Sequence, residues 1–400
     1  MAPAVRGGRR GGGRPRAADR GRPVGGDHRP RTRRRTLRRG DQPRPPTGGH
    51  GPAPPDGGRL PGVREAAAPR TQGRTPAVLA RRRPGAAREA AAVIIDAHVH
   101  AGEYYRHYSA RFAEQMTATT DLAPEELTAP EDRLLAEMDA AGVDRVFLLA
   151  FDVRRVEGFS VPNEFVADLC ARHPDRLTGF ASVDAGTPGA AGRLREAVTD
   201  LGLRGLKTAP CYLRMSPADR RWYDVYETAA DLDVPVLIHT GYTPSRNADP
   251  RFFSPLLVEQ VAKDFPGLKV ILAHLGTPWT GPCVELLARH PHLYADLSIF
   301  GSYQPPATVA KALAHARDRG VLDRLLWGTD FPFASMTGSV ARTAELARDP
   351  EPWPDGSDPL SPREYEDLMG GTAARLLAST TPHAAPAPRP PRPNRRLEVS

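Results

Sequence analysis

The chain has 400 residues, of which 26% are charged, and its formal net charge is +8. This charge is unevenly distributed, because residues 1–90 sum to +17 and residues 91–400 to −9. The basic N-terminal segment contains no Phe, Tyr, Trp or Ile, so it cannot bury enough apolar surface to offset its chain entropy. We therefore expect residues 1–92 to form a disordered Arg/Gly/Pro-rich tail, and residues 379–400 a second, Pro/Arg-rich tail.

The sequence also argues against a membrane-spanning, a secreted or a disulfide-stabilised protein. No apolar run reaches the roughly 18 residues of a membrane span, and none of signal-peptide length follows the basic start. The three cysteines are widely spaced and odd in number, which argues against a disulfide framework and favours a cytoplasmic protein.

Arg-rich runs can bind nucleic acid through its phosphates, but no aromatic residue interleaves the runs in this tail. The favoured interpretation is that this segment is a solvated tail, or that it lies upstream of the true start of the protein. No nucleic-acid partner is expected. A nucleic-acid-binding protein with a catalytically inactive folded region is the alternative from another class.

The stretch from Val93 to His100 reads V-I-I-D-A-H-V-H, and its β-branched start predicts a buried strand. Strict alternation of side chains along a strand predicts that Asp96, His98 and His100 point the same way. Two imidazoles on one face can hold a divalent metal. The competing interpretation is that the two histidines share a face by chance and only pack or hydrogen-bond.

From residue 130 onward, helical patterns alternate with short apolar runs. With the opening stretch, the expected strands are Val93–His100, Arg145–Phe151, Leu177–Val183, Leu203–Thr208, Val234–Thr240, Lys269–His274, Tyr294–Ile299 and Leu325–Thr329. Eight buried strands joined by helices predict an α/β fold, the (β/α)8 TIM barrel, over residues 93–378. An open doubly wound sheet is the alternative.

The roughly thirty residues after the first strand show no clear periodicity, which predicts a long loop or a small lid over a site. Its Tyr104 and Arg106 are candidates to clamp an anionic or aromatic substrate. Tyrosines that only pack the loop against the protein are the alternative.

Chemically active residues end four of the later strands. His239 ends the fifth, His274 the sixth and Asp330 the eighth, and Lys207 lies near the end of the fourth. Singly, each could be a hydrogen-bonded core residue or a turn residue. Because the C-terminal ends of barrel strands converge on one mouth, together they predict a metal site that includes the two histidines of the first strand.

At these residues the chain resembles the amidohydrolase superfamily, in particular the amidohydrolase-related branch that includes aminocarboxymuconate-semialdehyde and resorcylate-type decarboxylases. The resemblance covers about residues 93–378 and rests on D-A-H-V-H, L-I-H-T-G, L-A-H-L-G and G-T-D-F-P. It implies that His98, His100, His239 and Asp330 are the metal ligands and that His274 is a catalytic residue. In two-metal relatives a carboxylated lysine occupies the place of Lys207, whereas the branch that the chain resembles usually holds one metal.

Three imidazoles and a carboxylate leave a zinc ion able to activate water, so the first expectation is a metal-dependent hydrolase acting on a small organic acid, amide or lactone. Asp330 would pass a proton to the leaving group, and His274 would stabilise an oxyanion or act as an acid. The alternative is a non-oxidative decarboxylase of a small or aromatic carboxylic acid. Manganese or iron would also suit the ligands. Lys207, Tyr104, Arg106 and Tyr212 are the candidate substrate-binding residues, and a homodimer is a candidate assembly.

Overall fold

The computed structural model describes residues 93–118 and 123–380. The tail predicted over residues 1–92, and all but the first two residues of the tail predicted over residues 379–400, lie outside the described residues.

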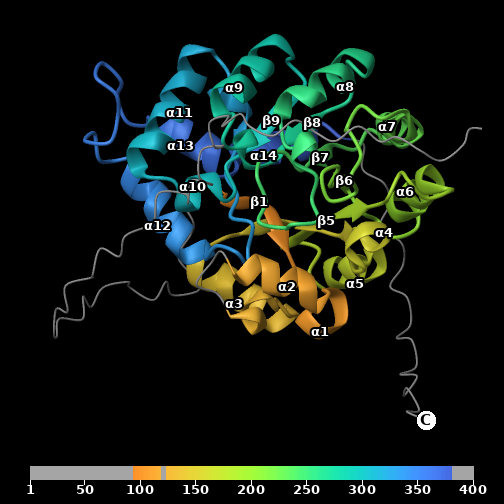
Figure 1. Ribbon diagram of the computed structural model, residues 1–400. Coiled ribbons are helices and arrows are strands. Elements are labelled where there is room, and N and C mark those ends of the chain that lie inside the picture. The colour runs from red at the N-terminus through yellow and green to blue at the C-terminus, as the bar shows by residue number, and fades with distance from the viewer. Residues whose placement is uncertain (1–92, 119–122, 381–400) are drawn as a thin grey trace, which may run out of the picture. The chain divides into compact units, whose positions relative to one another are not determined.

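Eight parallel strands form one sheet at the centre of the described chain (Figure 1). They are β1 (Ile95–His100), β2 (Arg145–Leu149), β5 (Leu177–Ser182), β6 (Gly205–Thr208), β7 (Val236–Ile238), β8 (Val270–Leu272), β9 (Leu293–Asp296) and β10 (Leu325–Leu326). They neighbour one another in this order, and each coincides with a strand predicted from the sequence. The (β/α)8 barrel is therefore confirmed, with shorter strands than the apolar runs suggested.

The barrel closes between β1 and the segment that follows β10. The Ala97 N–H donates to the Trp327 carbonyl at 3.0 Å, and the His100 N–H donates to the Phe331 carbonyl at 2.8 Å. The fully buried Asp96 carboxylate adds two bonds across the same seam, accepting from the Thr329 N–H at 3.0 Å and from the Thr329 hydroxyl at 2.5 Å. No edge of the central sheet is left open, which excludes the doubly wound alternative.

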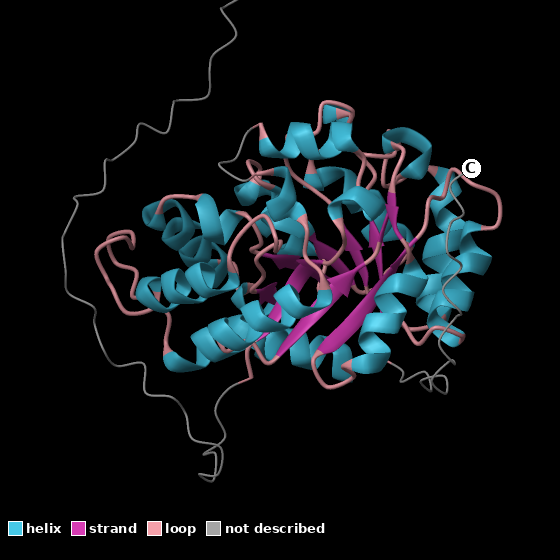
Figure 2. Ribbon diagram, turned by 90° about the horizontal axis from the view of Figure 1, so that it is seen from below, coloured by secondary structure: helices cyan, strands magenta, loops and turns pink. Residues whose placement is uncertain are grey.

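Helices surround the strands on the outside (Figure 2). Those of the repeating units are α3 (Glu131–Ala141), α5 (Asn163–Arg172), α6 (Ala190–Thr199), α7 (Tyr223–Asp231), α8 (Glu259–Asp264), α9 (Thr280–Arg289), α11 (Pro306–Asp318) and α12 (Met336–Leu346). Additional elements are α1 (Tyr104–His107), α2 (Ala110–Thr117), β3 (Phe151–Asp152), α4 (Arg154–Glu157), β4 (Ser160–Val161), α10 (Phe300–Tyr303), α13 (Pro362–Glu366) and α14 (Thr372–Ala378). In residues 93–118 and 123–380 no helix is long and apolar enough to cross a membrane.

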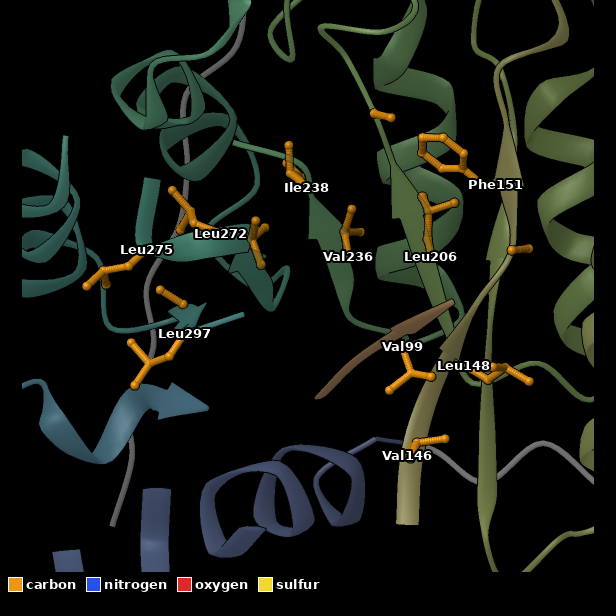
Figure 3. Packing of buried hydrophobic residues seen from close by; sticks show 14 of the residues in the cluster. Val99, Val146, Leu148, Phe151, Leu206, Val236, Ile238, Leu272, Leu275 and Leu297 are labelled. Carbon is orange, nitrogen blue, oxygen red and sulfur yellow. The ribbon is translucent and has the colours of Figure 1, made fainter. Parts of the chain in front are cut away.

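Apolar side chains from alternate strand positions fill two separate layers. One layer, with Phe147, Phe180 and Ile271 among its members, is also contacted by residues of α14. The larger layer lies between strands and helices, and Figure 3 shows part of it, including Val99 and Leu148. At the C-terminal ends of β7 and β6 the next inward-facing positions are occupied by His239 and Lys207, which are buried polar residues.

A β-bulge in β1 changes one expectation from the sequence. Asp96 pairs with Val146 and Val99 with Leu148, so three steps along β1 match two steps along β2. The extra residue puts Asp96 in phase with Val99 rather than with His98 and His100. The prediction that Asp96 shares the face of the two histidines is therefore wrong, and its carboxylate closes the barrel instead.

Replacing Asp96 tests the importance of this seam. The variant Asp96→Ala removes the acceptor of two buried backbone N–H groups, those of His98 and Thr329, and should lower the free energy of unfolding by about 2–4 kcal/mol. Thr329→Val, which removes one hydroxyl, should cost about 1 kcal/mol. Urea unfolding of the metal-free proteins measures both; an Asp96→Ala midpoint equal to that of the wild type would contradict this account.

Candidate metal centre

A cavity lies at the C-terminal ends of the strands, where the sequence predicts the functional residues. Its polar lining consists of His98, His100, Lys207, His239, His274 and Asp330. All six are buried. The structure thus brings together every residue that the sequence analysis assigned to the metal or to catalysis, from β1, from β6 and from the segments that directly follow β7, β8 and β10.

Three acceptor atoms face one another within this group. The Oδ1 atom of Asp330 lies 3.4 Å from Nε2 of His98 and 3.3 Å from Nε2 of His100. The Oδ1 atom of Asp330 and the Nε2 atom of His239 are buried and have no hydrogen-bond partner. Buried acceptors without donors are costly, and the spacing of His98, His100 and Asp330 suits a metal ion, so this group can hold a divalent cation.

Burial determines the charge of these groups. It lowers the pKa of His98, His100 and His239 well below the usual range, so these imidazoles are neutral and have lone pairs to offer. The same effect raises the pKa of the Asp330 carboxyl and lowers the pKa of Lys207. Lys207 Nζ lies 3.0 Å from Nε2 of His98, in the place of a cation beside the ligand set.

The backbone around Asp330 is specialised for this position. Its φ of 65° lies in the left-handed region that non-glycine residues rarely adopt. The Asp330 N–H donates to the His98 carbonyl at 2.8 Å, and the Asp330 carbonyl accepts from the Phe333 N–H at 2.9 Å. These bonds hold the carboxylate beside the histidines of β1.

Aromatic and apolar side chains form the rest of the cavity wall: Tyr108, Phe112, Met116, Phe151, Tyr212 and Phe333. The first three come from the segment after β1, which is not an irregular loop but contains the two helices α1 and α2. Of the two alternatives expected from the sequence, a long loop or a small lid, the lid therefore describes this segment better.

The candidate substrate-binding residues divide into two groups. Lys207 and Tyr212 line the cavity, and the Tyr212 hydroxyl lies 2.5 Å from that of Thr243. Tyr104 is buried outside the cavity lining, and the Arg106 side chain is 68% exposed and forms an ion pair with Glu103 at 3.6 Å. The structure thus gives no support to substrate contacts by Tyr104 or Arg106, because neither side chain lines the cavity.

Two residues behind the histidines escaped the sequence analysis. Asp296 ends β9 and accepts a hydrogen bond from Nδ1 of His98 at 3.0 Å, and the hydroxyl of Ser298 lies 2.8 Å from Nδ1 of His274. A signal existed, because Asp296 ends a buried apolar strand just as the other site residues do.

Comparisons with known proteins agree with this architecture. A model of the family described as amidohydrolase matches residues 95–378. A gamma-resorcylate decarboxylase from Rhodococcus jostii (strain RHA1) is 26% identical over 229 residues, covering 44% of this chain and 66% of the relative. A gamma-resorcylate decarboxylase from Polaromonas sp. (strain JS666 / ATCC BAA-500) is 25% identical over 261 residues, covering 52% and 78%.

Solved structures show the same fold. An uncharacterised TIM-barrel protein, Bb4693 from Bordetella bronchiseptica, superposes with a TM-score of 0.59 at 24% identity, covering 72% of this chain and 98% of its own. A dihydroxybenzoic acid decarboxylase from Polaromonas sp. JS666, with bound manganese and the inhibitor 2-nitroresorcinol, gives 0.52 at 19% identity, covering 72% and 97%. Since the family model spans nearly all of the described barrel and the motifs that carry the candidate metal ligands, the chain belongs to the amidohydrolase family.

Proposed function

We propose that this protein is a metal-dependent, non-oxidative decarboxylase of a small aromatic carboxylic acid. The observation that carries the proposal is the cavity itself, in which a cluster of metal-ligating side chains opens onto a wall of aromatic rings. Such a wall suits the faces and edges of an aromatic ring, and the cluster suits its carboxylate. The names of the two curated relatives point the same way, so we place this reaction ahead of the hydrolysis first expected from the sequence.

One divalent cation would be held by His98, His100, His239 and Asp330. The buried acceptors without partners, His239 Nε2 and Asp330 Oδ1, fit this role. When bound, the cation would supply positive charge to the substrate carboxylate and a neighbouring oxygen. Histidine and carboxylate ligands discriminate weakly among first-row metals, so the donor set accepts zinc, and it equally accepts manganese, the metal in the structural relative.

The side chains around the cavity would carry the reaction. The bond between the ring carbon and the carboxylate carbon breaks, its electron pair stays on the ring carbon, and carbon dioxide leaves. Asp330, buried at the cavity, would deliver the proton that this ring carbon takes up and then regain one from water. The His274 imidazole, also in the lining, would exchange a proton with a substrate hydroxyl. The aromatic wall would exclude water from the ring carbon.

A product assay distinguishes the two reactions. The metal-loaded protein, incubated with gamma-resorcylate, should release carbon dioxide and resorcinol in equal amounts, and protein treated with a chelator should release neither until manganese or zinc is restored. Infrared detection of carbon dioxide and chromatography of the phenol measure this outcome. Hydrolysis of an aromatic lactone such as dihydrocoumarin, without carbon dioxide from any benzoic acid tested, would favour the hydrolase.

Metal content tests the ligand assignment. His98→Ala and Asp330→Asn should each lower bound metal at least tenfold and nearly abolish turnover, because each removes one donor from a buried site. His315→Ala changes a half-buried histidine paired with Glu285 at 3.0 Å outside the cavity, and it should keep wild-type metal content. Elemental analysis of the purified, folded variants gives the result, and wild-type stoichiometry in both site variants would refute the assignment.

Lys207 offers a separate prediction about the substrate. Once His98 Nε2 binds a cation, the lysine ammonium becomes available to an anionic substrate oxygen. Lys207→Met should therefore retain the metal and raise KM for the acid by about 10-fold to 100-fold, the value of a charge-assisted hydrogen bond. Loss of metal with an unchanged KM would instead make Lys207 a support of the metal centre.

A further inference from the structure

The Asp296 carboxylate is the most heavily hydrogen-bonded group behind the cavity, and it is fully buried. Its Oδ2 atom lies 3.0 Å from Nδ1 of His98. Its Oδ1 atom accepts from the backbone N–H groups of His274 and Ser298, each at 3.0 Å, and from the Ser298 hydroxyl. We propose that Asp296 is the positioning residue of the metal centre: it sets which ring nitrogen carries the proton in three imidazoles. These belong to His98, His239 and His274.

The tautomer of His98 follows directly from this contact. A carboxylate has only acceptors, so Nδ1 of His98 carries the hydrogen and Nε2 keeps a lone pair. An independent contact gives the same tautomer, because Lys207 Nζ lies 3.0 Å from Nε2 and an ammonium has only donors. The lone pair therefore faces Asp330 and the cavity.

Through Ser298, Asp296 also determines the tautomer of His274. The serine hydroxyl has one hydrogen, and its bond to the acceptor Asp296 uses that hydrogen. The hydroxyl can then only accept from Nδ1 of His274, which lies 2.8 Å away, and the Ser298 carbonyl is a second, longer acceptor of that atom at 3.3 Å. His274 is thus protonated on Nδ1 and has a lone pair on Nε2.

His239 is the last member of the chain. Its Nδ1 atom lies 3.3 Å from Nε2 of His274, and because that atom has the lone pair, Nδ1 of His239 must donate. Nε2 of His239, which is buried without a hydrogen-bond partner, is left with a lone pair. One carboxylate thus makes Nε2 the free acceptor in two of the proposed ligands, although it touches only one of them.

The spacing of His98, His274 and Asp296 would by itself also suit a metal ion. However, the atoms of that group already bond to one another, to backbone N–H groups and to the Ser298 hydroxyl between them. We therefore assign this cluster to the support of the proposed metal centre and not to a second ion.

The inference rests on the proposed metal site, and the variant Asp296→Asn in the full-length protein tests it. Because three donors converge on Oδ1, the asparagine carbonyl should take that place and turn its NH2 group toward Nδ1 of His98. An NH2 group only donates, so the His98 hydrogen should move to Nε2, where it blocks metal binding. We expect the affinity for manganese to fall about 10-fold to 100-fold, which is the usual loss when a residue that hydrogen-bonds to a metal ligand is replaced.

Two measurements are made on each protein. Imidazole nitrogen-15 spectra of the histidine-labelled, metal-free protein report the tautomers, and calorimetry with manganese reports the affinity. Ser298→Ala should keep the His98 tautomer and add a minor second tautomer to the spectra of His274 and His239, because only the longer bond from Nδ1 of His274 to the backbone carbonyl of residue 298, at 3.3 Å, remains. Asp184→Asn is the matched control, since Asp184 is equally buried but pairs with Arg155 at 2.7 Å and belongs to no metal-suited group in the described residues; both readouts should stay at wild type.

A His98 ring still protonated on Nδ1 in Asp296→Asn, with wild-type manganese affinity, would overturn the inference. If that variant does not fold, unchanged His274 and His239 spectra in Ser298→Ala overturn it instead. The spectra need neither metal nor substrate, so they are independent of the proposed reaction. A wild type with these tautomers that decarboxylates no acid would contradict the proposed function alone.

Discussion

Hydrogen bonds between β1 and the segment after β10 are the constraint on which the proposed metal centre depends. They join backbone groups of His98 and His100 to those of Asp330 and Phe331, so the contacts that close the barrel also set the spacing of the proposed ligands. Asp96 strengthens this seam from the opposite face of the bulged strand. A change that loosens the seam would therefore alter stability and the site together.

Burial also shapes the site, because it keeps the imidazoles neutral and so gathers several hydrogen-bond acceptors in one cavity. Neutral imidazoles and a carboxylate face one another in a buried cavity, and buried acceptors without donors are stabilised by a nearby positive charge. Lys207 supplies part of that charge. A divalent cation would supply it more fully, which is the physical reason for proposing a metal at this site.

The barrel and the ligand set are compatible with more than one reaction, since a fold carries many chemistries and the site decides among them. Here the deciding feature is the wall opposite the ligands. Tyr108, Phe112 and Met116 from the lid segment, with Phe151 and Phe333, make it largely apolar, and this character is why we propose an aromatic acid as the substrate.

The sequence by itself determined the eight strands and the six polar residues at their ends, because apolar runs and the residues that end them are local features. The tertiary structure decided what depends on contacts between distant segments. The bulge that separates Asp96 from His98 comes from pairing with β2, and the hydrogen bond between His98 and Asp296 joins residues 198 positions apart. The exclusion of Arg106 from the cavity depends on how α1 packs. Register and packing are properties of two segments at once, and no single stretch of sequence contains them.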